Sequence, residues 1–150
     1  MKGFKFKLDA VLKVRKLKED QCKMELGRLQ VEKQKRIDEI KRQNLGIDKA
    51  YGDQESTVQK GATGLDLRFY PYFMQGKRTN IMLLEQEIAE IEKDIAHKNK
   101  ELIDHRANVK VLESMKEKQQ MKYKKELNKK IDQDIEEQVM NWMQFKKANL

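Results

Sequence analysis

One interruption divides this chain into two long stretches of helical character. It runs from Ser56 to Gly76 and contains Gly61, Gly64 and the one proline, Pro71. Glycine and proline weaken or end helices, whereas apolar residues on either side recur at helical spacing. We therefore predict an all-α hairpin in which the chain reverses within this interruption.

Each stretch carries an apolar seam with alternating steps of three and four residues, the pattern of a coiled coil. The first seam runs from Leu8 to Tyr51 and the second from Ile81 to Tyr123. The first seam includes Cys22 and four polar residues, Arg15, Glu19, Lys33 and Asn44. The pattern predicts a long antiparallel two-helix coiled-coil hairpin. We place it in one domain, residues 1–150, with a first helix over about 8–56, a turn over about 57–68 and a second helix over about 69–146.

The two predicted helices differ in length. At about 1.5 Å per residue, antiparallel pairing leaves the second helix overhanging by roughly 40 Å. Leu8 is then expected opposite residues 116–120. The overhanging part has no partner within the chain, and we expect its apolar side chains to dock on another molecule. These side chains are Ile131, Ile135, Val139, Trp142 and Phe145.

Composition excludes several classes of protein. Charged residues make up 39% of the chain and its net charge is +8, which is typical of long helices and not of a thick core. No apolar run approaches the roughly 18 residues that span a bilayer, and the start of the chain lacks the features of a secretory signal. The single Cys22 excludes an internal disulfide and favours a reducing compartment. We expect a cytoplasmic, elongated protein.

No residue pattern indicates catalysis, so we predict no enzyme, no cofactor and no metal site. His97 and His105 are two helical turns apart, about 12 Å, which is too far to share one metal ion. Cys22 lies on the seam and is interpreted as a small buried residue. The stretch from Gly61 to Gly64 lacks the Gly-Lys-Ser/Thr ending of a phosphate loop and indicates a turn.

Two aromatic features leave alternatives open. The cluster from Phe69 to Phe73 could close the tip of the hairpin, but neighbours on a helix are about 100° apart, so at least one ring is expected to remain outside. Trp142 could cap the end of its helix or anchor a partner.

The start of the chain resembles the FliJ family of flagellar export proteins. That family has a Phe-x-Phe-x-Leu-x-x-Val-Leu-x-x-Arg pattern with a glutamate soon after it, and Phe4, Phe6, Leu8, Val11, Leu12, Arg15 and Glu19 match it. Tyr70, Phe73, Ile81 and Leu84 look like the segment that opens the family's second helix. The resemblance implies an antiparallel two-helix coiled coil similar to the stalk of the rotary ATP synthase gamma subunit.

The resemblance also implies partners within the flagellar type III protein export apparatus. They are the hexameric export ATPase FliI, bound through the end that carries both termini, the export gate membrane protein FlhA, bound near the hairpin tip, and export chaperones. It further implies regulation of the ATPase and peripheral association with the inner membrane at the flagellar base. The residues expected to bind the ATPase are Phe4, Phe6, Leu8, Val11, Leu12, Arg15, Lys16, Ile131, Ile135 and Trp142. Those expected to bind the gate are Tyr70, Phe73, Asn80 and Leu84.

Other functions remain open at this point. The same object could serve as the stalk of a virulence type III secretion apparatus. The basic charge is also compatible with a nucleic-acid-binding coiled coil, and a parallel homodimer has the same seam pattern. Because no basic region leads into a zipper and no aromatic stacking motif occurs, we predict no nucleic acid among the partners. We expect a monomer in the free state.

Overall fold

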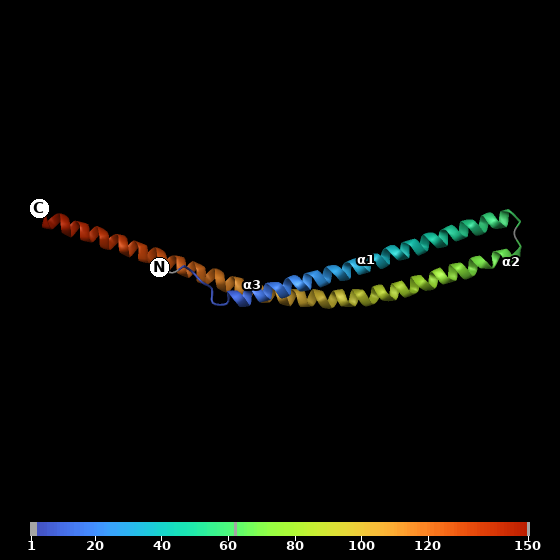
Figure 1. The fold of residues 1–150 in the computed structure, drawn as a ribbon, viewed down its shortest axis with the longest axis horizontal. Helices are drawn as coiled ribbons and strands as arrows, with labels where there is room; N and C mark the ends of the chain where they lie inside the picture. The colour runs from blue at the N-terminus through green and yellow to red at the C-terminus, as the bar shows by residue number, and fades with distance from the viewer. Residues whose placement is uncertain (1–2, 62, 150) are drawn as a thin grey trace. The chain divides into compact units, whose positions relative to one another are not determined.

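The structure, a computed structural model, describes residues 3–61 and 63–149 of the chain. They form three helices, α1 (Asp9–Gln59), α2 (Gly64–Leu67) and α3 (Phe69–Ala148) (Figure 1). No strand occurs among these described residues. The all-α prediction is confirmed, and so is the longer second helix, since α3 has 80 residues and α1 has 51.

The chain divides into two compact units, and each contains part of α1 and part of α3. We call residues 20–103 the tip unit, and residues 1–19 together with 104–150 the terminal unit. A single domain over 1–150 remains a prediction.

In the tip unit, α1 and α3 pack side by side and antiparallel (Figure 1). Lys98 Nζ lies 2.5 Å from Glu25 Oε2, Lys33 Nζ lies 3.2 Å from Glu92 Oε1, and Arg36 Nε lies 2.8 Å from Glu87 Oε2. Each step forward along α1 is thus matched by a step back along α3. The antiparallel prediction is confirmed.

The reversal between the long helices is built by a glycine and a capped short helix. Gly61 has a φ of +82°, a left-handed conformation that costs an L side chain energy but not glycine. Thr63 then caps α2, because its side chain accepts a hydrogen bond from the Asp66 amide while the Asp66 carboxylate accepts one from the Thr63 amide. Pro71 lies in the first turn of α3, where its missing N–H removes no helical hydrogen bond.

The core of the tip unit is small. Ile47, Ala50 and Met74 are buried there, and Tyr70 and Phe73 are partly buried against them. Aromatic side chains from the first turns of α3 therefore cover the last turns of α1. This packing holds the two helices together beside the reversal.

In the terminal unit, the start of the chain packs on α3. Phe6, Leu12, Val109 and Leu112 form a buried cluster, because the seam positions Leu12, Val109 and Leu112 of the two helices face each other and Phe6 packs with them. Residues 3–6 are not helical. The Phe4 ring packs on this cluster, and its centroid lies 5.8 Å from that of Tyr123. We call residues 3–16 the N-terminal segment. It covers α3 as far as Tyr123.

Polar residues of the seam pair across the two helices. In the terminal unit, Arg15 Nη1 donates a hydrogen bond to the Asn108 carbonyl oxygen at 3.1 Å. Lys116 Nζ donates one to Asp9 Oδ1 at 3.1 Å. Such exposed pairs add little stability, about 0–1 kcal/mol each. The Lys116–Asp9 pair also favours one register, because the two charges meet only in that alignment.

Beyond Tyr123, α3 continues without a neighbouring helix in the terminal unit (Figure 1). We call residues 124–148 the tail. No tail residue is buried, and Leu127 alone is partly buried. The predicted overhang of the second helix is thus confirmed. Within the described residues, no helix has a stretch long and apolar enough to cross a membrane.

Replacement of Leu12 by alanine should destabilise the chain by about 2–3 kcal/mol, because Leu12 is only 3% exposed and its loss leaves a cavity beside Val109 and Leu112. Val14, which is 51% exposed on the same helix, supplies the control, and Val14→Ala should cost less than about 0.5 kcal/mol. Urea unfolding followed by circular dichroism measures both. Equal losses for the two variants would contradict this packing.

The pKa of the Asp9 carboxyl is lowered, chiefly by its hydrogen bond from Lys116. The stabilisation linked to this carboxylate is therefore present above the pKa of Asp9 in the unfolded chain. It is lost as the pH falls through the lower pKa of the folded state. A carboxyl carbon NMR titration should show a low midpoint for Asp9 that moves up in Lys116→Met. Lys118→Met, which alters an exposed lysine on another side of α3, should leave the midpoint unchanged. An unshifted midpoint in Lys116→Met would exclude Lys116 as the cause.

Candidate functional site

The predicted ATPase-binding residues near the start of the chain differ in how deeply they are buried in the terminal unit. Phe6 and Leu12 are buried in the cluster with Val109 and Leu112, and Phe4 is half-buried against Tyr123. Leu8 and Val11 are exposed. Phe6 and Leu12 therefore fix the N-terminal segment on α3, and Leu8 and Val11 present apolar surface.

Two of the residues predicted to bind the ATPase, Arg15 and Lys16, are basic, and both reach α3. Arg15 binds the Asn108 carbonyl oxygen, and Lys16 Nζ lies 3.4 Å from Glu113 Oε1. Lys16 is about half exposed, so its ammonium group remains accessible from solvent. Both side chains contribute to the packing of the two helices as well as to the positive surface.

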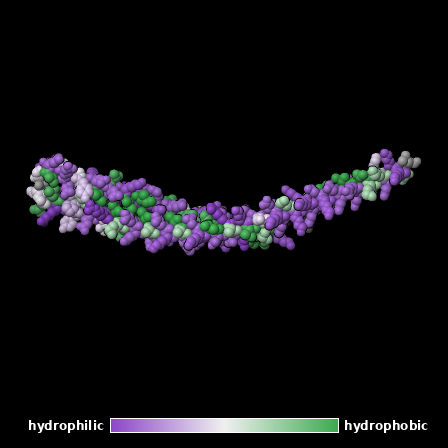
Figure 2. Space-filling view, turned by 180° about the vertical axis from the view of Figure 1, so that it is seen from behind, coloured by the Kyte–Doolittle hydropathy of each residue, from purple (hydrophilic) through white to green (hydrophobic). Residues whose placement is uncertain are grey.

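The tail carries an exposed apolar stripe. Ile131, Ile135 and Trp142 are all exposed. With about 3.6 residues per turn, these positions fall within one side of the helix. Val139 and Phe145 add to the same stripe and are also exposed. Figure 2 shows hydrophobic surface along one side of the part of α3 that leads to the C-terminus.

Trp142 is not buried as a cap of the helix end. Its ring is exposed, and Lys146 Nζ lies 5.0 Å from the ring centroid, within cation–π distance. The buried cluster that holds Phe6 and Leu12, with Phe4 packed against it, includes none of Ile131, Ile135 and Trp142. The two groups of predicted ATPase-binding residues thus belong to one unit but form separate surfaces.

The predicted gate-binding residues lie on α3 in the tip unit. The Tyr70 hydroxyl lies 3.0 Å from Thr57 Oγ1, and the Phe73 ring stacks on Phe69 with centroids 5.6 Å apart. Asn80 is exposed and Leu84 is half-buried along the seam. The structure therefore brings Tyr70, Phe73 and Leu84 toward α1 and leaves Asn80 at the surface.

The aromatic cluster at the tip divides between the two roles left open by the sequence. Tyr70 and Phe73 pack on the core of the tip unit. Phe69 and Tyr72 are exposed. One pair closes the tip, and the other pair remains outside.

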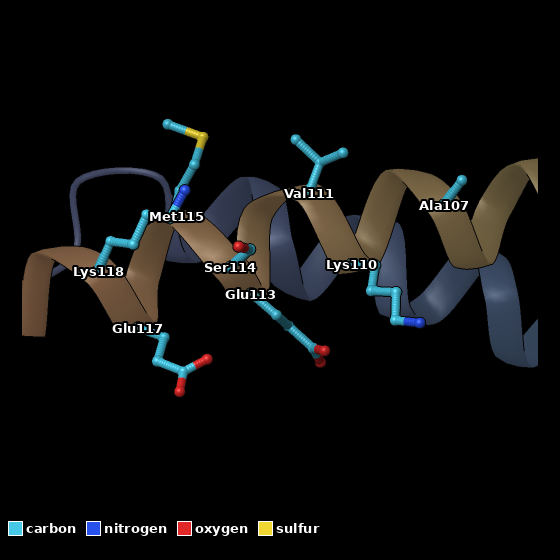
Figure 3. Close-up of a pocket in the computed structure, with 8 residues that line it drawn as sticks. All are labelled: Ala107, Lys110, Val111, Glu113, Ser114, Met115, Glu117 and Lys118. Atoms are coloured by element: carbon cyan, nitrogen blue, oxygen red, sulfur yellow. The ribbon is translucent and has the colours of Figure 1, made fainter.

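A groove on α3 in the terminal unit was not predicted from the sequence (Figure 3). We call it the outer groove. Ala107, Val111 and Met115 project along one edge, Glu113 and Glu117 project along the other, and Ser114 lies between them (Figure 3). Lys110 and Lys118 complete its lining.

The signal for the outer groove is a second apolar row on α3. Val109 and Leu112 face α1, whereas Ala107, Val111 and Met115 recur every four residues on another side of the helix. The seam is a single row of positions, and this second row lies off it. A count of apolar residues on every side of the helix would have found it.

In the tip unit, Lys98 and Arg36 have a shifted pKa, and both are members of ion pairs. The pKa of Lys98 is raised, first by its hydrogen bond to Glu25 and then by that to Glu101. The pKa of Arg36 is raised by Glu32 and Glu87 in the same way. The ion pairs that cause these shifts stabilise the charged forms of Lys98 and Arg36. The pairs with Glu25 and Glu87 also join α1 to α3.

Cys22 is buried in the tip unit, and its thiol lies 3.5 Å from the Lys98 carbonyl oxygen, to which it donates. The prediction of a small buried residue is confirmed. His97 is exposed, and its Nε2 lies 3.0 Å from Glu101 Oε1, one helical turn along α3.

Comparison with protein families gives one that fits this architecture. The family described as "Flagellar FliJ protein" matches residues 4–146. Comparison with curated proteins and with solved structures gives no match. The family match includes the N-terminal segment, the seam of both helices and nearly all of the tail. The chain therefore belongs to the FliJ family and is a component of the flagellar protein export apparatus.

Proposed function

We propose that this chain is a non-enzymatic stalk of the flagellar type III export apparatus that binds both an export ATPase ring, similar to FliI, and an export gate, similar to FlhA. The observation that carries this proposal is the exposed apolar stripe of the tail in a member of the FliJ family. The stripe has no partner among the described residues, and exposed apolar surface of this extent is typical of an interaction site.

The terminal unit supports the ATPase contact. Ile131, Ile135 and Trp142 offer large apolar side chains on one side of a helix, a composition common at the centres of interfaces. Lys16 and the lysines of the tail add positive charge, which steers association with acidic loops. In this proposal, Phe4, Phe6 and Leu12 hold the N-terminal segment in place, and Leu8, Val11 and Arg15 extend the contact surface.

The tip unit supports the gate contact. Tyr70, Phe73 and Leu84 fix the side of α3 on which Asn80 is exposed. The Phe73 ring remains partly accessible on this side of α3. Lys77 Nζ lies 5.2 Å from its centroid. We assign the gate contact to this surface.

The remaining elements of the proposal rest on the resemblance to the family and on the motifs that the sequence lacks. Export chaperones are further partners, and the chain regulates the ATPase from the cytoplasm at the inner-membrane base of the flagellum. It requires no cofactor and binds no nucleic acid. The family match favours the flagellar apparatus over a virulence secretion apparatus.

The double variant Ile135→Ser/Trp142→Ser should weaken binding to the purified export ATPase by at least about tenfold, because it removes two interface anchors. Isothermal titration calorimetry measures the change. Met24→Ser/Leu45→Ser removes comparably exposed apolar side chains from the tip unit and is the matched control. Arg15→Glu/Lys16→Glu should also weaken the ATPase contact. Wild-type affinity in both terminal-unit variants would contradict the proposal.

Binding to the gate protein and to the ATPase can be measured on the same pair of variants. Asn80→Glu should weaken binding to the cytoplasmic part of the gate protein and leave binding to the ATPase unchanged, and the tail variant should do the reverse. Gln86→Glu introduces the same charge at another exposed position of α3 and is the control. A loss of both partners in each variant would indicate misfolding and not separate sites.

A further inference from the structure

The outer groove has the residue spacing that receives side chains from a neighbouring helix. In knobs-into-holes packing, one side chain enters a hole between residues i, i+3, i+4 and i+7 of the facing helix. Ala107, Lys110, Val111 and Ser114 have this spacing and line the groove. A second hole, one turn further along, includes Met115, and the small Ser114 leaves room in both (Figure 3). Any helix has positions with this spacing, but here the small residues Ala107 and Ser114 lie beside exposed Val111 and Met115, which leaves room for a side chain of a second helix.

The apolar edge of the groove is open to solvent. Val111 is 57% exposed, whereas Val109 and Leu112 on the side toward α1 are 5% and 4% exposed. Over these turns α3 thus has two apolar sides, of which one is covered by α1. A helix with two apolar sides is typical of packing against two neighbours.

The same spacing continues into a hole that is lined by lysines. Lys118, Met121, Lys122 and Lys125 surround the next depression on α3, again at i, i+3, i+4 and i+7. None of these three lysines has an ion pair within the described parts of the chain. Lys116, which faces α1, is paired with a carboxylate. The charge of the lysine-lined hole therefore calls for acidic side chains from another molecule.

We propose that the outer groove and the adjoining lysine-lined hole bind an acidic amphipathic helix of a partner protein. Apolar side chains of that helix enter the holes beside Val111 and Met115, and its Asp or Glu side chains lie over Lys118, Lys122 and Lys125. The apolar edge of the groove next to the positive charge of Lys118, Lys122 and Lys125 favours this partner over nucleic acid, whose backbone offers charge without an apolar row. This surface is separate from the apolar stripe of the tail.

The test uses the full chain and a synthetic fluorescein-labelled helical peptide. The peptide carries leucine at the a and d positions of about three heptads and glutamate at the e and g positions. Fluorescence anisotropy should show binding to the wild-type chain that falls at least about tenfold in Val111→Glu and in Lys118→Glu/Lys122→Glu. A peptide with lysine in place of each glutamate should bind more weakly than the acidic peptide.

Matched control variants distinguish peptide binding at this surface from nonspecific binding elsewhere on the chain. Val31 is 55% exposed in the tip unit, so Val31→Glu makes the same change at similar exposure, and Lys41→Glu/Lys49→Glu matches the charge reversal. These variants, and Ile135→Ser/Trp142→Ser, should bind the acidic peptide as the wild type does. Equal binding by all variants, or no binding by the wild type, would overturn the proposal.

Two further outcomes would also overturn it. If the chain alone sediments as a dimer and Val111→Glu makes it a monomer, the groove is covered by a second copy. If the lysine variant loses binding to a labelled DNA duplex but keeps binding to the peptide, the lysines bind nucleic acid and not an acidic helix. A monomer with peptide binding that depends on both Val111 and the lysines supports the proposal.

Discussion

The packing of the N-terminal segment on α3 is the contact on which the terminal unit depends. Phe6 and Leu12 bury their side chains against Val109 and Leu112, and burial of this kind contributes about 1.5–3 kcal/mol for each large side chain. The contact fixes where α1 begins along α3. It therefore also fixes how much of α3 remains uncovered, and the apolar side chains that follow Tyr123 lie outside the coiled coil.

Polar pairs set the register within which this burial occurs. Lys116 reaches the Asp9 carboxylate, so a shift by one helical turn would separate these two charges. Arg15 binds a backbone carbonyl oxygen, that of Asn108, and a shift would offer it another. Apolar burial alone discriminates less between alignments, because leucine and isoleucine recur along both seams. Apolar burial supplies the stability, and the polar pairs select one alignment.

Most of the fold could be predicted from the sequence because its determinants are local. Gly61 and Pro71 mark the ends of the helices, and the steps of three and four residues mark the sides that pack. The difference in helix length indicated the exposed tail. The capping pair of Thr63 and Asp66 required the structure, because it depends on the backbone geometry of the turn.

The candidate surfaces could be predicted less completely. Phe6 and Leu12 match a family pattern together with Leu8 and Val11, but burial separates the two pairs, and burial depends on the path of residues 3–6 across α3. The division of the tip aromatics into buried Tyr70 and exposed Tyr72 also required the structure. The outer groove could not be predicted from the seam, because its apolar residues lie on another side of α3.

Amide hydrogen exchange of the chain, alone and with the export ATPase, tests the central claim most directly. Exchange should be slow over residues 106–116 in both states, because α1 covers this part of α3 within the terminal unit. The tail should exchange faster in the free chain and become protected when the ATPase is added. A tail that is already as protected as residues 106–116 in the free chain, or that stays unprotected in the complex, would contradict the account.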